Sequence, residues 1–370
     1  MNIKIEERYK HLSEPDTMGS YSKDDCVFLL KNINDLMEEQ SNEEREKLNQ
    51  SGVHYSEMLP IEYEPKEEYI EFFHKILDTE KEKLAELIAI LCQKIVAKRG
   101  KNTVFVSLAR AGTPIGVLMK RYMKFKYNLD IPHYSISIIR GKGFDENALC
   151  YILHNHPDSF IQFIDGWTGK GAITKVLESA CTDFNNKYDT NLEPDLAVLS
   201  DPANCVSLCA TKDDFLIPSA CLNSTISGLL TRTVERKDLI GEYDYHGAKY
   251  YDHWKEKDIS NYYIETISNL YTDKDFDFEI ETTPNFSGWS DTENIMKAFG
   301  INDINLVKPS VGECTRVLLR RVPWKILIDD FDNPNLKHIL MLAKDRNVPV
   351  EIYKNMSYSC VGIIKSMRGE

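Results

Sequence analysis

At residues 163–172 the chain reads Phe163-Ile164-Asp165-Gly166-Trp167-Thr168-Gly169-Lys170-Gly171-Ala172. The apolar residues before Asp165 predict a buried parallel strand, and the segment from Gly171 to about Asn186 predicts the helix that follows. Free N–H groups at such a helix N-terminus can face a phosphate without a Cβ in the way. A turn that needs positive φ would also explain the glycines, so both interpretations stay open.

Spacing excludes two common nucleotide-binding motifs. Gly166 and Lys170 are too close for a Walker loop, Gly171 stands where its Mg²⁺-binding hydroxyl should be, and a dinucleotide fingerprint does not fit either. The turn instead resembles the ribose-phosphate loop of the phosphoribosyltransferases. That resemblance implies that Asp165 contacts the ribose hydroxyls and Mg²⁺, and that the 5′-phosphate is held by Thr168, Gly169, Lys170 and Gly171. Most members carry two adjacent acids, whereas this chain has one.

A second turn lies upstream, after an apolar strand at residues 103–108. Ala109-Arg110-Ala111-Gly112 leads into Thr113 as N-cap and Pro114 as the first residue of a helix that runs to about Lys126. The turn resembles the Arg-Gly-Gly-like pyrophosphate loop of the transferases, which implies that Arg110 and the backbone of Ala111 and Gly112 hold the leaving group. An ordinary strand-to-helix turn with a solvent-facing Arg is the alternative.

Between these turns, residues 134–139 predict a buried strand, and Arg140-Gly141-Lys142-Gly143 follows it. The transferases carry a flexible hood at this place, which implies that Arg140 and Lys142 close over the reacting sugar. A solvated charged loop explains the segment equally well.

Longer strings narrow the resemblance. They are Gly19-Ser20-Tyr21, residues 28–31, residues 52–60, residues 107–116, residues 165–171 and residues 214–224. Together they resemble the StiP family of bacterial tellurite-resistance and stress gene clusters over about residues 15–275. This family is described both as a predicted phosphoribosyltransferase and as a cysteine protease, and its C-terminal part is similar to a Pelota-type RNA-binding domain.

The protease description directs attention to Cys221. We expect a helix to begin near Ser219, and a Cys in its first turn would have a lowered thiol pKa, as a nucleophile requires. His54 is a candidate base and Asn223 or Asp201 a candidate orienting group. A buried Cys that packs beneath the helix is the commoner outcome for such a residue, so Cys221 is the alternative nucleophile rather than the main prediction.

Residues 291–370 predict a small α/β/α domain that follows residues 1–285, with the junction near 273–290. Between Lys308 and Arg346 there are eight basic and five acidic residues, which gives a net charge of +3 inside a chain of −13. A turn that opens a helix resembles the RNA-contacting edge of the Pelota-type domain. The resemblance implies RNA contacts from Lys308, Arg316, Arg320 and Arg321; a structural or dimerising appendix is the alternative.

Composition sets further limits. The chain has 370 residues, nine scattered cysteines and no apolar stretch of transmembrane length. Reduced thiols in the cytoplasm fit these cysteines better than a disulfide framework. A net charge of −13 argues against a global field that coats nucleic acid, and a homodimer stays open. The N-terminal region predicts a helical extension, with a helix at residues 23–36.

The resulting hypothesis is a cytoplasmic α/β protein of the phosphoribosyltransferase type, with a mostly parallel sheet flanked by helices. It would use phosphoribosyl pyrophosphate, Mg²⁺ and an unidentified acceptor, with no membrane partner. A thiol hydrolase built on Cys221 and a non-catalytic, nucleotide-sensing RNA-binding regulator are the alternatives.

Overall fold

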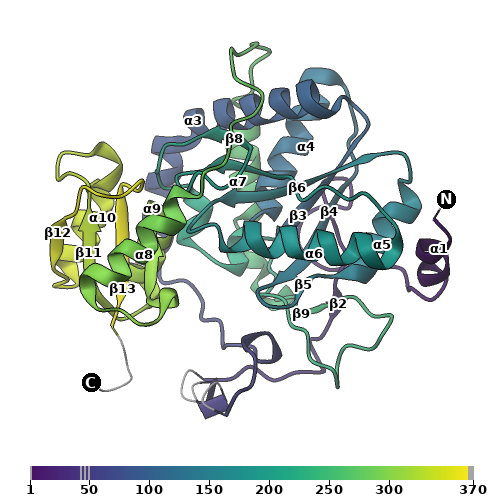
Figure 1. Ribbon diagram of the computed structural model, residues 1–370, viewed down its shortest axis with the longest axis horizontal. Coiled ribbons are helices and arrows are strands. Elements are labelled where there is room, and N and C mark those ends of the chain that lie inside the picture. Colours follow the sequence, from purple (N-terminus) through teal and green to yellow (C-terminus); the bar gives the residue numbers. More distant parts are fainter. Residues whose placement is uncertain (1, 42–43, 46, 49–50, 366–370) are drawn as a thin grey trace.

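The computed structural model describes residues 2–41, 44–45, 47–48 and 51–365, and it places a large α/β unit beside a small C-terminal one (Figure 1). In Figure 1 the N-terminus lies on the side of the large unit away from the C-terminal unit. Within the described residues no helix is long and apolar enough to cross a membrane.

A seven-stranded sheet forms the centre of the large unit, in the order β1-β4-β3-β6-β7-β8. All pairs along this path are parallel, and β5 pairs antiparallel with β4. A separate parallel pair joins β2 to β9. The strands are β1 (Val27–Phe28), β2 (Lys31–Asn32), β3 (Thr103–Ala109), β4 (His133–Ile139), β5 (Gly143–Phe144), β6 (Phe160–Trp167), β7 (Leu196–Ser200), β8 (Leu208–Thr211) and β9 (Gly247–Ala248).

Helices cover both faces of this sheet because its central strands are buried on both sides. On one face lie α3, α4 and α7, and on the other α5 and α6 (Figure 1). The helices of this unit are α1 (Ile3–Tyr9), α3 (Glu67–Arg99), α4 (Thr113–Tyr127), α5 (Glu146–Asn155), α6 (Ala172–Tyr188) and α7 (Ser260–Ser268). Short 3₁₀ helices occur at η1 (Tyr55–Glu57), η2 (Pro218–Cys221), η3 (Ser224–Ile226) and η4 (Asp252–Lys257).

The C-terminal unit has its own four-stranded sheet in the order β10-β13-β11-β12. Its strands are β10 (Val307–Pro309), β11 (Pro323–Ile328), β12 (Val350–Ile352) and β13 (Cys360–Ile364). Its helices are α8 (Ser287–Phe299), α9 (Val311–Arg320) and α10 (Lys337–Asp345), with 3₁₀ turns at η5 (Ile304–Leu306) and η6 (Pro334–Leu336). Buried residues of α9 belong to the same apolar core as α3 and η2, so the two units share a packed interface.

The predicted fold class is confirmed: a mostly parallel sheet flanked by helices, with a smaller C-terminal domain. The helix predicted at residues 23–36 is wrong. That segment forms β1 and β2, which pair with β4 and β9 far along the chain, so tertiary pairing overrides the local helix pattern.

Candidate functional site

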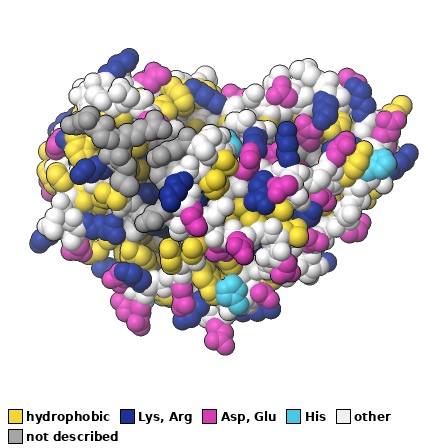
Figure 2. All heavy atoms as spheres, turned by 90° about the horizontal axis from the view of Figure 1, so that it is seen from below, with side chains coloured by type: hydrophobic (Ala, Val, Ile, Leu, Met, Phe, Trp, Pro, Cys, Tyr) yellow, Lys and Arg dark blue, Asp and Glu magenta, His cyan; other side chains and the backbone are white. Residues whose placement is uncertain are grey.

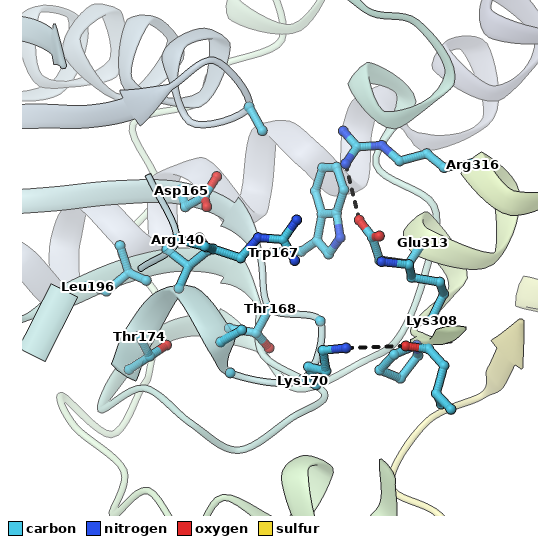
Figure 3. A pocket seen from close by; sticks show the side chains of 17 residues that line it. Arg140, Asp165, Trp167, Thr168, Lys170, Thr174, Leu196, Lys308, Glu313 and Arg316 are labelled. Carbon is cyan, nitrogen blue, oxygen red and sulfur yellow. Dashed lines mark hydrogen bonds and ion pairs between the residues drawn. The ribbon is translucent and has the colours of Figure 1, made fainter. Parts of the chain in front are cut away.

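A cavity of about 320 Å³ lies where the carboxyl end of the sheet meets the C-terminal unit (Figure 3). Strand β6 and the loop after it supply one wall, and the first turn of α6 supplies the floor. Strand β10 and helix α9 supply the opposite wall. The polar and aromatic side chains that line it are those of Arg140, Asp165, Trp167, Thr168, Lys170, Thr174, Lys308, Glu313 and Arg316.

The glycine-rich loop is held from two sides. Thr168 Oγ1 donates to the Oδ1 atom of Asp201 at 2.7 Å, at the end of β7. The hydroxyl of Tyr358, from the C-terminal unit, donates to the carbonyl of Gly169 at 2.8 Å. Gly171 has φ 81° at the N-cap of α6, a conformation that an L side chain rarely adopts. The loop is therefore fixed in a form that exposes the helix N-terminus to the cavity.

Asp165 points into the cavity from the end of β6 (Figure 3). Burial raises the pKa of its carboxyl to about 6; the N–H of Gly166 and the charge of Arg316 act against this, while Glu313 adds to it. Its Oδ1 accepts the N–H of Gly166 at 2.8 Å. Among the described residues no group of three potential metal ligands is present, and the role of Asp165 as an Mg²⁺ ligand stays a prediction.

Lys170 connects the loop to the C-terminal unit. Its Nζ donates to the carbonyl of Ile304 at 2.5 Å and to that of Val307 at 3.5 Å. Burial lowers its pKa to about 8, and the neighbouring charges of Lys308 and Arg140 act in the same direction. Lys308 and Arg140 thus lie close enough to Lys170 to disfavour its charge.

Helix α9 contributes a stacked cation. The guanidinium of Arg316 lies 4.6 Å from the centroid of the Trp167 ring and forms an ion pair with Glu313 at 3.1 Å. Its Nε is buried and has no hydrogen-bond partner within the described part of the chain. Lys308 faces the same cavity, and burial lowers the pKa of its ammonium group.

Two of the four predicted catalytic residues lie away from the cavity. The Nη1 atom of Arg110 is paired with Glu62 at 3.0 Å and donates to the carbonyl of Leu230 at 2.7 Å. Lys142 pairs with Glu57 at 3.5 Å and with Glu235 at 3.3 Å. Both cations are neutralised by carboxylates that sequence reasoning did not connect to them, so only Asp165 and Arg140 of that set line the cavity.

The turn before α4 makes a mixed contribution. Ala111 lines the cavity, but Gly112 is packed against β6. A Cβ at Gly112 would lie 2.4 Å from the carbonyl oxygen of Ile164 in β6. The close approach of the β6 backbone is therefore sufficient to explain why residue 112 is a glycine. Gly112 is also the N-cap of α4, one residue earlier than predicted.

Cys221 lies at a different part of the same interface. It ends the 3₁₀ helix η2, where an α-helix was predicted, and its side chain is buried. Arg320 of α9 donates to the Cys221 carbonyl at 2.7 Å and also to Asn223 Oδ1. Burial raises the pKa of the thiol to about 12, although the charges of Arg320 and Arg316 lower it. The predicted lowering of this thiol pKa is therefore wrong for the structure described.

The suggested partners of Cys221 have other contacts. The Nδ1 atom of His54 is 2.9 Å from Ser56 Oγ, and Asp201 accepts from Thr168. No hydrogen bond joins the Cys221 thiol to a histidine anywhere in the described ranges of the chain. A catalytic dyad is therefore not assembled in this conformation.

A residue that sequence reasoning left without a role is Asp214. Its carboxylate accepts the N–H of Val311 at 2.8 Å and that of Ser359 at 3.0 Å, both in the C-terminal unit. Burial raises its pKa to about 7. The string Asp214-Phe215-Leu216-Ile217-Pro218 was a family signal, but only the structure shows that its acid fastens the two units together.

Comparisons with known proteins also divide the chain into a large N-terminal part and a small C-terminal part. Residues 19–268 match the family model described as "Tellurite-like stress resistance cysteine protease StiP", and residues 286–366 match "PELOTA RNA binding domain". A curated relative, "Cysteine protease StiP" of Acinetobacter baylyi (strain ATCC 33305 / BD413 / ADP1), is 34% identical over 357 residues, which cover 90% of each chain.

These matches confirm the resemblance to the StiP family and the resemblance to the Pelota-type RNA-binding domain, and they correct the predicted activity. The phosphoribosyltransferase prediction, with phosphoribosyl pyrophosphate as substrate, is wrong, because the family and the relative are both named as cysteine proteases. The contacts of Arg110 agree with the correction, since the residue assigned to the pyrophosphate is already paired with Glu62.

Proposed function

We propose that this chain, which belongs to the StiP family, is a cysteine protease whose nucleophile is Cys221. The names of the family and of the relative support the activity. The choice of Cys221 rests on its position beside two cations: Arg320 donates to its carbonyl, and although burial raises the pKa of the thiol to about 12, the charges of Arg320 and Arg316 act to lower it. Cations beside a thiol are what a nucleophilic cysteine requires.

Two buried hydroxyls support the same assignment. Ser224 Oγ and Thr225 Oγ1 follow Cys221 by three and four residues and have no hydrogen-bond partner among the described residues. Unpaired buried donors cost free energy, so a protein rarely keeps two in succession without a use for them. Such donors suit a substrate carbonyl oxygen, which gains negative charge when a thiolate attacks.

The chemistry divides into two steps. The sulfur of Cys221 attacks the peptide carbonyl carbon, the C–N bond breaks, and the departing amine takes up the proton that the thiol has released. Water then hydrolyses the thioester and frees the cysteine. Because burial dominates the thiol pKa while α9 covers η2, the described conformation is a closed one, and hydrolysis requires α9 to withdraw.

The test compares two buried cysteines with similar thiol pKa values, Cys221 and Cys181. We expect hydrolysis of an unfolded protein substrate by the wild-type chain or by Arg320→Ala, in which the contact to the Cys221 carbonyl is absent. Activity should be lost in Cys221→Ala and kept in Cys181→Ala. Hydrolysis that survives Cys221→Ala would overturn the assignment. So would the absence of hydrolysis together with the absence of Cys221 alkylation in Arg320→Ala.

RNA binding by the C-terminal unit is the second proposed function, and the match of residues 286–366 to an RNA-binding domain supports it. Lys308 and Arg316 lie in the cavity, Arg320 contacts Cys221, and Arg321 is exposed at the end of α9. On the face drawn in Figure 2, positive and negative side chains are interspersed. We therefore expect a local contact with RNA, made by Lys308, Arg316, Arg320 and Arg321.

This proposal predicts few phosphate contacts and a shallow dependence on salt. Loss of one contact, in Arg321→Ala of the full chain, should reduce the log–log slope of affinity against salt by roughly 0.7 to 0.9. Lys337→Ala removes an exposed charge from the start of α10 and serves as the matched control. Binding that does not change with salt in the wild-type chain would contradict the proposal.

A further inference from the structure

The cavity between the large unit and the C-terminal unit, here named the junction cavity, is lined by more positive than negative side chains. Arg140, Lys170, Lys308 and Arg316 face two carboxylates, those of Asp165 and Glu313 (Figure 3). Arg316 and Glu313 pair with each other. A cavity that is lined by both units and keeps surplus cations requires a counter-charge, because close cations in a low-dielectric site repel one another.

Two of these cations have no protein acceptor. Within the described residues the side chains of Lys308 and Arg140 make neither a hydrogen bond nor an ion pair; Arg140 only lies over the Tyr55 ring at 5.5 Å. Exposed lysines elsewhere, such as Lys337, also have no ion pair among the described residues, but water surrounds them. Lys308 differs because it lines the cavity and is partly removed from water, which lowers the pKa of its ammonium group.

Two further features supply directed donors. The buried Nε of Arg316 has no acceptor within the described chain, and a buried charged donor without a partner is costly. The first turn of α6, a helix of 17 residues, lines the floor with N–H groups that have no partner inside the helix. Forked guanidinium donors and a helix N-terminus together match the oxygens of a phosphate.

We propose that this cavity binds a phosphate monoester carried by a ribonucleotide at the end of an RNA strand. The surplus of two positive side chains matches the dianionic monoester better than the single charge of an internal diester. A cavity of about 320 Å³ is about the size of a single nucleotide. Asp165 and Glu313 are acceptors that suit ribose hydroxyls.

The identity of the carrier rests on the proposed RNA binding, because Lys308, Glu313 and Arg316 come from the unit that matches the RNA-binding family. A free mononucleotide carries the same monoester. The two sources are therefore separate arms of the experiment.

The experiment measures binding of the full chain to four ligands at one salt concentration. These are a short single-stranded RNA with a 5′-phosphate, the same RNA with a 3′-phosphate, the same RNA with hydroxyl ends, and a ribonucleoside 5′-monophosphate. We expect at least one phosphorylated RNA to bind about tenfold tighter than the hydroxyl form, as one or two charge-assisted hydrogen bonds imply.

Arg140→Ala and Lys170→Met should remove that preference while binding of the hydroxyl RNA persists. The Arg140 side chain makes no hydrogen bond to any described residue, so Arg140→Ala keeps the test valid if Lys170→Met fails to fold. Lys337→Ala, which removes an exposed charge outside the cavity, should keep the preference.

Each outcome has one meaning. Equal affinity of the wild-type chain for phosphorylated and hydroxyl RNA overturns this inference and leaves RNA binding intact. Binding of the mononucleotide alone, lost in Arg140→Ala, supports the monoester site but overturns both the RNA carrier and the proposed RNA binding. Failure of every phosphorylated ligand to bind overturns the site.

Discussion

The two units of this protein meet in two places that differ in character. At the Cys221 contact, apolar side chains of α9 and η2 share one core, and a thiol is held neutral. At the junction cavity, which Arg316 of α9 lines four residues before Arg320, polar side chains surround open space, and two cationic side chains, those of Arg140 and Lys308, have no hydrogen-bond or ion-pair partner among the described residues. The first place joins the units by burial, whereas the second leaves a site that a ligand can fill.

This difference suggests how one helix can serve both places. Arg316 faces the cavity and Arg320 holds the Cys221 carbonyl, four residues apart and so on one side of α9. A ligand in the cavity acts on the same helix that covers the thiol. The following variants separate the contribution of each place, from the largest expected effect to the smallest.

Leu318→Ala should have the largest effect on stability. Leu318 is fully buried in α9 and belongs to the core that contains Cys221. Truncation of a buried leucine typically costs about 2–5 kcal/mol in the free energy of unfolding. Chemical denaturation measures this cost, and alkylation of Cys221 should become faster because its cover is weakened. A loss below about 1 kcal/mol would show that the apolar contact does not hold the units together.

Asp214→Asn should change the pH dependence of stability. Burial raises the pKa of Asp214 to about 7 in the folded chain, above the usual value of about 3.9 in an unfolded one. Between these pH values the folded state keeps a proton that the unfolded state has released. The free energy of unfolding from this group therefore falls as pH rises from about 4 to about 7.

Each pKa unit corresponds to about 1.4 kcal/mol. Denaturation of the wild-type chain and of Asp214→Asn at pH 5 and at pH 8 measures the effect. The wild-type chain should lose stability relative to the variant at the higher pH. A difference that is the same at both pH values would mean that Asp214 does not titrate in this range.

Arg320→Ala should have an intermediate effect. It removes the hydrogen bonds to the Cys221 carbonyl and to Asn223, and a bond from a charged donor is worth about 1.5–3 kcal/mol. Because the contact that Arg320 makes is partly exposed to water, we expect a loss in the free energy of unfolding at the low end of this range, as measured by chemical denaturation. The result expected is faster alkylation of Cys221; an unchanged rate would show that Arg320 does not control access to the thiol.

Arg140→Ala should have the smallest effect on stability. Its side chain makes no hydrogen bond within the described chain and is exposed, so the free energy of unfolding should stay within about 0.5 kcal/mol of the wild-type value. Thermal denaturation without ligand measures it. A substantial loss would mean that the cavity, like the Cys221 contact, holds the units together, and the comparison between the two places would fail.

Much of the fold could be predicted because it depends on local patterns. The apolar run before Asp165 and the glycine-rich turn after it correspond to β6 and the start of α6. The small α/β/α domain expected in the C-terminal segment corresponds to the four-stranded sheet and the helices of the C-terminal unit. Residues 23–36 were predicted incorrectly because β1 and β2 exist only through partners more than 100 residues away.

The candidate site was predictable only in part. The loop that contains Thr168 and Lys170 lies in the cavity as its strand-turn-helix placement indicated. The environment of Cys221 was not predictable. Its low pKa was inferred from an expected α-helix N-terminus, but Pro218 begins a 3₁₀ helix there and α9 covers the thiol, so desolvation dominates over nearby charge.

The sequence alone therefore determined the α/β class and the turn at residues 165–171, because periodicity and turn chemistry act between near neighbours in the chain. The two family segments were recognised by the resemblance of their motifs. The tertiary structure decided which charges are free. Arg110 is paired with Glu62, and Lys142 is paired with Glu57 and Glu235. The side chains of Arg140 and Lys308 have no acceptor among the described residues. Such pairing depends on distances across the folded molecule, and Coulomb energy follows those distances rather than separation along the chain.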